Sequence, residues 1–228
     1  MYYGYGFSYL IYIVPGLLLA LYAQSRISSA YRKNSAIDSG TGLTGAETAK
    51  KLMNNNGIFD VSIVPVSGEL TDHYNPSNKT LNLSHDVYYG TSVASLSVAA
   101  HEVGHAIQDH VDYVPLKIRG ALVPAANIGS SLSMVFIILG IVSSFFIKIG
   151  IFMFSLAVLF QIITLPVEFD ASRRAKQELA KGIMPQDKLK VTKEVLTAAA
   201  LTYVASTLTA IGELLRLIAI FGNRDSRD

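Results

Sequence analysis

The stretch SVAAHEVGHAIQDH contains the pattern His-Glu-x-x-His at His101, Glu102 and His105. On a helix, residues four positions apart lie on the same face, so the two imidazoles would point the same way and could share one zinc ion. Glu102 would lie beside that ion, where its carboxylate can take a proton from water. The pattern fixes only three residues, so the rest of the chain must decide between a hydrolytic zinc centre and a chance match.

A hydrolytic zinc centre needs three protein ligands, and HEVGH supplies two of them. The longer pattern HExxHxxGxxH is not present, because Gln108 and Val111 occupy the positions of its glycine and its third histidine. His110 follows His101 by nine residues and would therefore lie on the opposite side of a continuous helix. The chain has no cysteine, so the third ligand must be a His, Asp or Glu from another segment.

The composition favours a membrane protein. Hydrophobic residues make up 50% of the chain and charged residues 16%, whereas soluble domains carry about 25% charged residues. Apolar stretches lie at 7–24, 122–147, 151–165 and 192–221. We expect the first three to span the membrane, and we favour spanning over peripheral packing for the last. The net charge of +2 is too small to indicate a nucleic-acid partner.

Residues 121–166 are expected to form a transmembrane hairpin with Lys148 and Gly150 in its connection. The hairpin returns the chain to the membrane face on which the two histidines lie. Glu168 is the first acidic residue after that return, and Pro166 is well placed to start a new helix there. Glu168 is therefore the candidate third ligand. A carboxylate that only stabilises a helix N-terminus is the alternative.

The polar segment 25–120 is expected to be a small α+β zincin-like unit. Thr44 and Glu47 form a capping box that predicts the start of a helix, which Asn54-Asn-Asn-Gly57 would end. Short strands are expected at about 60–66, 69–74 and 80–84, before the helix that carries HEVGH. Gly104 lowers helix propensity, and we expect it to allow another segment to approach the metal.

The basic residues indicate the topology. Nine of the 19 lie beside the ends of the apolar stretches that face 25–120 and 167–191, whereas only Lys148 is expected at the hairpin tip. The nine are Arg26, Arg32, Lys33, Lys117, Arg119, Arg173, Arg174, Lys176 and Lys181. Positive charge gathers on the cytoplasmic side of membrane proteins. We therefore expect a multi-pass protein of the cytoplasmic (inner) membrane, with residues 1–24 as an uncleaved anchor. Its tyrosines Tyr2, Tyr3, Tyr5 and Tyr9 suit the membrane interface.

HEVGHAIQ together with the downstream EFDASRRA resembles the YugP-type neutral zinc metallopeptidases of bacteria, which are membrane relatives of the HtpX and CAAX prenyl protease type. The resemblance covers nearly the whole chain. It implies that His101, His105 and Glu168 bind one Zn²⁺ and that Glu102 is the catalytic residue. The HtpX-type pattern reads Glu-x-x-Ala-Asp, whereas this chain has Ser172 at the last position. The sequence alone leaves open whether Asp170 takes the place of the missing carboxylate.

The leading functional hypothesis is a zinc-dependent endopeptidase that hydrolyses peptide bonds at the cytoplasmic face of the membrane. Its partners would be a protein or peptide substrate and membrane lipid, with no nucleic acid and an oligomeric state that the sequence leaves open. A non-catalytic zinc-binding membrane adaptor or assembly factor is the alternative. A transporter that uses Glu213 and Arg216 is a weaker third, since the two residues could simply pair at a helix end.

Peptide hydrolysis also needs a donor for the oxyanion. The candidates for this or a supporting role are His73, His85, Asp170, Arg173, Arg174 and Tyr203. Each has an ordinary alternative: a loop or strand-edge position for the histidines, helix packing for Tyr203, and an ion pair between Arg174 and Asp170. An exposed edge on the strand Thr80, Leu81, Asn82, Leu83 and Ser84 could bind an extended peptide. A purely structural role for this strand is equally open.

Overall fold

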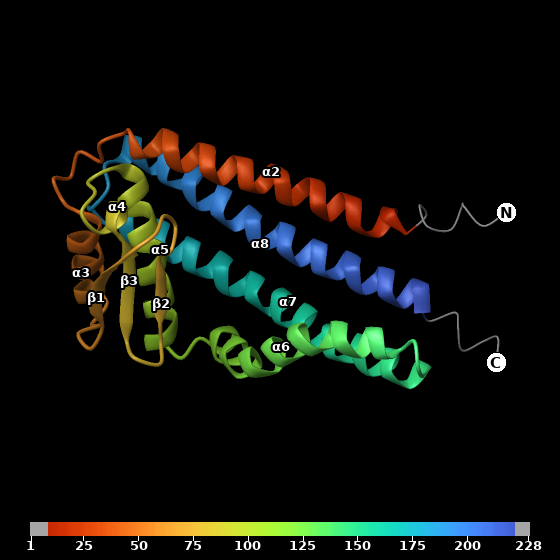
Figure 1. Cartoon of the computed structure of the whole chain (residues 1–228). Coiled ribbons are helices and arrows are strands. Elements are labelled where there is room, and N and C mark those ends of the chain that lie inside the picture. Colours follow the sequence, from red (N-terminus) through yellow and green to blue (C-terminus); the bar gives the residue numbers. More distant parts are fainter. Residues whose placement is uncertain (1–8, 222–228) are drawn as a thin grey trace. The chain divides into compact units, whose positions relative to one another are not determined.

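Helices dominate the computed structural model, which describes residues 9–221 (Figure 1). The elements in chain order are α2 (Leu10–Ser35), α3 (Gly45–Asn55), β1 (Ser62–Val66), β2 (His73–Asn75), β3 (Thr80–Ser84), α4 (His85–Tyr88), α5 (Val93–His110), α6 (Val114–Leu139), α7 (Ser144–Ala180) and α8 (Gln186–Phe221). The predicted mainly helical membrane fold with a small sheet is thus confirmed. Of the tyrosines expected at the membrane interface, Tyr2, Tyr3 and Tyr5 lie outside the described residues.

The described chain divides into two compact units. The helical unit contains residues 9–24, 118–165 and 202–221. The site unit contains residues 25–117 and 166–201, and it holds all three strands, the HEVGH helix and Glu168. Helices α2, α6, α7 and α8 each contribute residues to both units.

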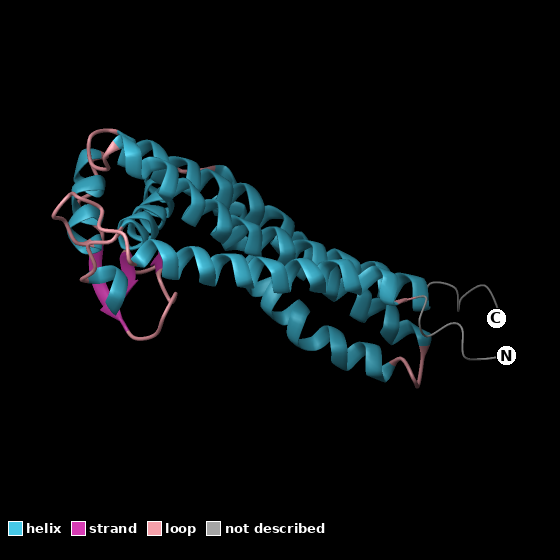
Figure 2. Cartoon of the chain, turned by 90° about the horizontal axis from the view of Figure 1, so that it is seen from above, coloured by secondary structure: helices cyan, strands magenta, loops and turns pink. Residues whose placement is uncertain are grey.

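The sheet of the site unit has the strand order β1-β3-β2. Strand β1 pairs with β3 in parallel along its whole length, and β2 pairs with β3 antiparallel from His73 opposite Asn82 to Asn75 opposite Thr80. In Figures 1 and 2 the strands form one small patch, and the other elements are helices. Because β3 is the central strand, the expectation that Thr80–Ser84 presents an exposed edge is wrong. The free edge of the sheet near α5 belongs to β2.

The core of the site unit is formed by α3, β3, α5 and the last part of α7. Leu52 and Met53 on α3, Leu81 and Leu83 on β3, and Leu96 on α5 are all fully buried. Burial of one such side chain stabilises the fold by about 1.5–3 kcal/mol. The predicted capping box is present, since Thr44 Oγ1 accepts from the Glu47 amide and Glu47 Oε2 accepts from the Thr44 amide. The capping box therefore sets the residue at which α3 begins, and this start determines which face of the helix is buried.

In the helical unit, backbones approach one another closely at glycines. A Cβ atom on Gly129 would overlap the Met153 carbonyl oxygen, and one on Gly212 would overlap the Tyr12 carbonyl oxygen. Small residues at such crossings are typical of helices that pack within lipid. Among the described residues, four helices are long and apolar enough to cross a membrane: α2, α6, α7 and α8.

Two boundaries predicted for the hairpin are wrong. The connection of the hairpin lies at 140–143, and Lys148 and Gly150 are already inside α7. Ser143 precedes the helix and its Oγ accepts from the Phe145 amide, so local turn chemistry outweighs the single charge at Lys148. Helix α7 also runs through Pro166 instead of starting there. A proline removes one donor and kinks a helix, which long membrane helices tolerate.

Candidate metal centre

Helix α5 carries the two histidines of HEVGH and buries them within the site unit. Ser92 precedes the helix, and its Oγ accepts a hydrogen bond from the Ser95 amide, which fixes the helix start. Ala99, Ala100 and Val103 are buried in the core. The side chains of His101 and His105 are only 12% and 10% exposed. Because the helix is anchored at its start and along its buried face, both imidazoles have a defined direction.

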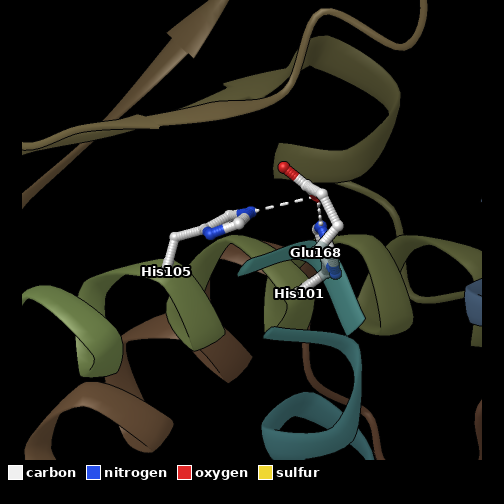
Figure 3. Close-up of side chains that lie close together, drawn as sticks. All are labelled: His101, His105 and Glu168. Carbon is white, nitrogen blue, oxygen red and sulfur yellow. Dashed lines mark hydrogen bonds and ion pairs between the residues drawn. The ribbon is translucent and has the colours of Figure 1, made fainter. Parts of the chain in front are cut away.

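Helix α7 brings Glu168 to these imidazoles. Glu168 Oε2 lies 3.2 Å from His101 Nε2 and 3.4 Å from His105 Nε2. Figure 3 shows the three side chains converging from α5 and α7 on one point. Among the described residues they form the one group of three or more His, Cys, Asp or Glu side chains arranged to hold a metal ion, with their ligand atoms within 4.8 Å of one another.

The donor set fits zinc. Zinc is bound by His nitrogen and carboxylate oxygen in tetrahedral geometry with bonds of about 2.0–2.1 Å, so two ligand atoms of one ion lie about 3.3–3.4 Å apart. The two histidine-to-glutamate separations of 3.2 and 3.4 Å match this spacing. Two imidazoles and one carboxylate would also leave a fourth position for water or substrate, which is the arrangement of hydrolytic zinc sites.

The electrostatics of the site favour an ionised carboxylate. Burial alone would raise the pKa of Glu168, but hydrogen bonds from His101 and His105 lower that pKa well below its usual range. For His105, burial alone would lower the pKa, but the hydrogen bond and charge of Glu168 raise it overall. The buried pair thus keeps Glu168 in the anionic form that binds metal.

Each of the two imidazoles has a polar neighbour at its Nδ1 nitrogen. His101 Nδ1 lies 3.2 Å from Ser172 Oγ, and His105 Nδ1 lies 3.0 Å from Gln108 Oε1. Asp170 accepts from Gln108 and from both Arg173 and Arg174. Burial would raise the pKa of Asp170, but these hydrogen bonds, above all that from Arg174, lower it. Asp170 is therefore connected to His105 through Gln108, and Ser172 itself contacts His101.

Glu102 directly follows His101 on α5 and is held by the sheet. It is 7% exposed, and its Oε2 accepts a 2.9 Å hydrogen bond from the Tyr74 backbone amide on β2. The Tyr74 hydroxyl in turn donates to Asp109 at 2.7 Å, and Asp109 also pairs with Lys79. Sequence reasoning missed Tyr74, because nothing in its neighbourhood shows which residue a backbone amide will contact. The outer edge of β2 is thus directed at the carboxylate.

The remaining predicted site residues lie in different places. His73 is exposed on β2, with its Nδ1 2.8 Å from the Thr71 carbonyl oxygen, and His85 is exposed on α4. Arg173 and Arg174 pair with Asp170. Tyr203 belongs to the helical unit. His110 is the exposed last residue of α5 and is not part of the metal-binding group.

Gly104, between the two histidines, allows α7 to approach α5. A Cβ atom at this position would lie 2.5 Å from the Ala171 carbonyl oxygen, too close for an ordinary contact. Gly104 thus permits a close approach of α7 to α5, and α7 is the helix that carries Glu168.

We predict that Gly104→Ala lowers the free energy of unfolding by about 1–3 kcal/mol, the usual cost of overpacking, and weakens zinc binding because α7 must move. Chemical unfolding and a zinc titration in detergent measure the two effects. Gly120→Ala on α6 is the control, because a Cβ there meets nothing within 4 Å. Equal stability and zinc affinity for Gly104→Ala and the parent would contradict this role.

Comparisons with known proteins agree with the geometry. The chain is 44% identical over 213 residues to a protein of Bacillus subtilis (strain 168) described as "Putative membrane protease YugP", and the match covers 92% of this chain and 95% of the relative. No solved structure matches the chain. A family model described as "Putative neutral zinc metallopeptidase" matches residues 9–222, which include HEVGH and Glu168. The chain therefore belongs to the "Putative neutral zinc metallopeptidase" family.

Proposed function

We propose that the protein is a zinc-dependent endopeptidase of the cytoplasmic membrane that hydrolyses peptide bonds at the cytoplasmic face. The observation that carries this proposal is the convergence of His101, His105 and Glu168, with both histidine-to-glutamate separations at zinc-ligand spacing and Glu102 next to His101 on the same helix. The family and the name of the relative support the same activity.

The residues divide the chemistry between them. His101, His105 and Glu168 hold the ion, which when bound polarises the scissile carbonyl and acidifies water. Glu102 accepts the proton of the attacking water as the new carbon–oxygen bond forms. It then delivers that proton to the leaving nitrogen as the carbon–nitrogen bond breaks. The Tyr74 amide holds Oε2 of Glu102, so Oε1 is the oxygen available for proton transfer.

An extended substrate would bind along β2. The Tyr74 amide points away from β3 and toward Glu102, so the outer edge of β2 borders the reacting groups. An unpaired strand edge binds peptides through main-chain hydrogen bonds. Thr80–Ser84 would then act by holding β2 in place. Of the predicted oxyanion donors, His73 lies on the same strand, and we propose that it serves this role. Arg173 and Arg174 are instead engaged in ion pairs with Asp170.

For the topology, we propose that residues 25–120 and 167–191 are cytoplasmic. Residues 1–24, 121–166 and 192–222 would form the membrane part. The concentration of Arg and Lys in and beside 25–120 and 167–191 supports this orientation. The four long apolar helices would supply the membrane spans.

Metal removal tests the activity. The full chain, purified in detergent, should cleave an unfolded protein substrate, lose this activity on treatment with a zinc chelator, and regain it with one equivalent of Zn²⁺. A protein that binds one equivalent of zinc but cleaves neither unfolded nor membrane-embedded substrates would favour the adaptor alternative. Restoration by Mg²⁺ but not Zn²⁺ would contradict the metal assignment.

A further inference from the structure

Gln108 is buried between the two helices that carry the zinc ligands. It lies one turn after His105 on α5, and none of its surface is exposed. Its side chain contacts His105, the carbonyl oxygen of Val167 and the carboxylate of Asp170. Val167 directly precedes Glu168. One side chain therefore connects the second histidine ligand to the backbone beside the third ligand.

The contacts of Gln108 fix its orientation. The amide nitrogen lies 2.8 Å from the Val167 carbonyl oxygen and 3.0 Å from Asp170 Oδ2. Both of these atoms accept hydrogen bonds, so the NH₂ group must face them. Gln108 Oε1 then faces His105 Nδ1 at 3.0 Å and can only accept, so Nδ1 carries the proton. With the proton on Nδ1, a neutral His105 presents Nε2 as its metal-binding atom.

The geometry points to Gln108 as a positioning residue for the zinc centre: it fixes the tautomer and ring direction of His105 and ties them to the position of Glu168. Asp170 supports this role, because it accepts a hydrogen bond from Gln108 and is itself held by ion pairs with Arg173 and Arg174. Outer hydrogen-bond partners of metal-binding histidines commonly set the ring orientation and ligand strength. The inference rests on the proposed zinc-peptidase function.

Ser172 gives His101 a weaker constraint. Its Oγ lies 3.2 Å from His101 Nδ1, and a hydroxyl group can both donate and accept. Its contact therefore does not decide which nitrogen of His101 carries the proton. The carboxylate of Asp170 reaches His105 only through the neutral amide of Gln108, and the contacts at Nδ1 of both imidazoles come from uncharged groups.

Gln108→Met tests the inference, because methionine has a similar length and makes none of these hydrogen bonds. We expect its zinc affinity, measured in competition with a chromophoric chelator, to fall about 10–100-fold. Ser97→Ala is the matched control: Ser97 is fully buried on α5 and donates to the Val93 carbonyl oxygen, away from the ligands. Its zinc affinity should stay within about twofold of the parent. A folded Gln108→Met protein with parental affinity would overturn the role.

A second measurement uses the parent protein and does not depend on how the variant folds. In the zinc-loaded full chain with ¹⁵N-labelled histidine, His105 should bind the metal through Nε2 and show a slowly exchanging Nδ1–H signal in NMR spectra. Binding through Nδ1, or rapid exchange of this proton, would refute the inference. Failure of the parent to bind zinc at all would instead refute the proposed function, so the two failures are distinguishable.

Discussion

Replacement of Glu102 by Gln is expected to lower the rate of peptide hydrolysis by about 10²–10⁴-fold, the usual contribution of a positioned general base, while zinc stays bound. The amide of glutamine is nearly the same size as the carboxylate, and its oxygen can still accept the hydrogen bond from the Tyr74 amide. It cannot, however, take the proton from water. Single-turnover cleavage assays on the purified variant, with zinc measured in the same sample, test this expectation.

Glu194→Gln is a suitable control for loss of charge. Glu194 pairs with Lys33 at the surface of the site unit, and exposed pairs of this kind contribute only about 0–1 kcal/mol. Its activity should equal that of the parent. If Glu102→Gln kept more than a tenth of the parental rate with full zinc, another residue would have to serve as the base.

Glu168→Ala is expected to weaken zinc binding by more than the roughly 10–100-fold that loss of an outer hydrogen-bond partner costs, because it removes one of three ligands. The variant should lose peptidase activity in parallel. Competition with a chelator of known affinity measures the metal, and circular dichroism checks the helices. The reason is geometric: without Oε2 of Glu168, the two imidazoles of α5 are the remaining protein donors of the group.

Glu178→Gln provides the matched control on the same helix. Glu178 is also buried, but it accepts from Asn56 and Lys181, away from the imidazoles. Zinc binding by this variant should be close to that of the parent. Full retention of zinc by Glu168→Ala would remove Glu168 from the ligand set and require a different third donor.

Much of the metal-binding group could be predicted from the sequence. HEVGH fixes His101 and His105 by helical spacing alone. Glu168 followed from the return of an apolar hairpin to its starting side, and the structure groups it with the histidines. This inference survived two wrong details, the position of the hairpin turn and a helix start at Pro166. The prediction of Glu168 depended only on which membrane face the chain returns to after the hairpin. Neither error changes that face, so the prediction of Glu168 was unaffected.

Strand order and outer contacts could not be predicted. Three short strands allow several arrangements, and local patterns do not reveal that β3 is central and β2 borders Glu102. The contact between Tyr74 and Glu102 uses a backbone amide, which every residue except proline possesses. The role of Gln108 depends on the packing of α5 against α7, since its partners lie 59 and 62 residues further along the chain.

The long separation of the ligands in the chain has a consequence for biosynthesis. His101 is made 67 residues before Glu168, and the intervening segment contains α6 and the apolar first part of α7. A ribosome must therefore translate the whole hairpin before a three-ligand centre can form. Incomplete chains that carry HEVGH alone lack the carboxylate ligand. Assembly of the group of His101, His105 and Glu168 is thus coupled to completion of α6 and the first part of α7, and a chain that ends before Glu168 carries only two of these three side chains.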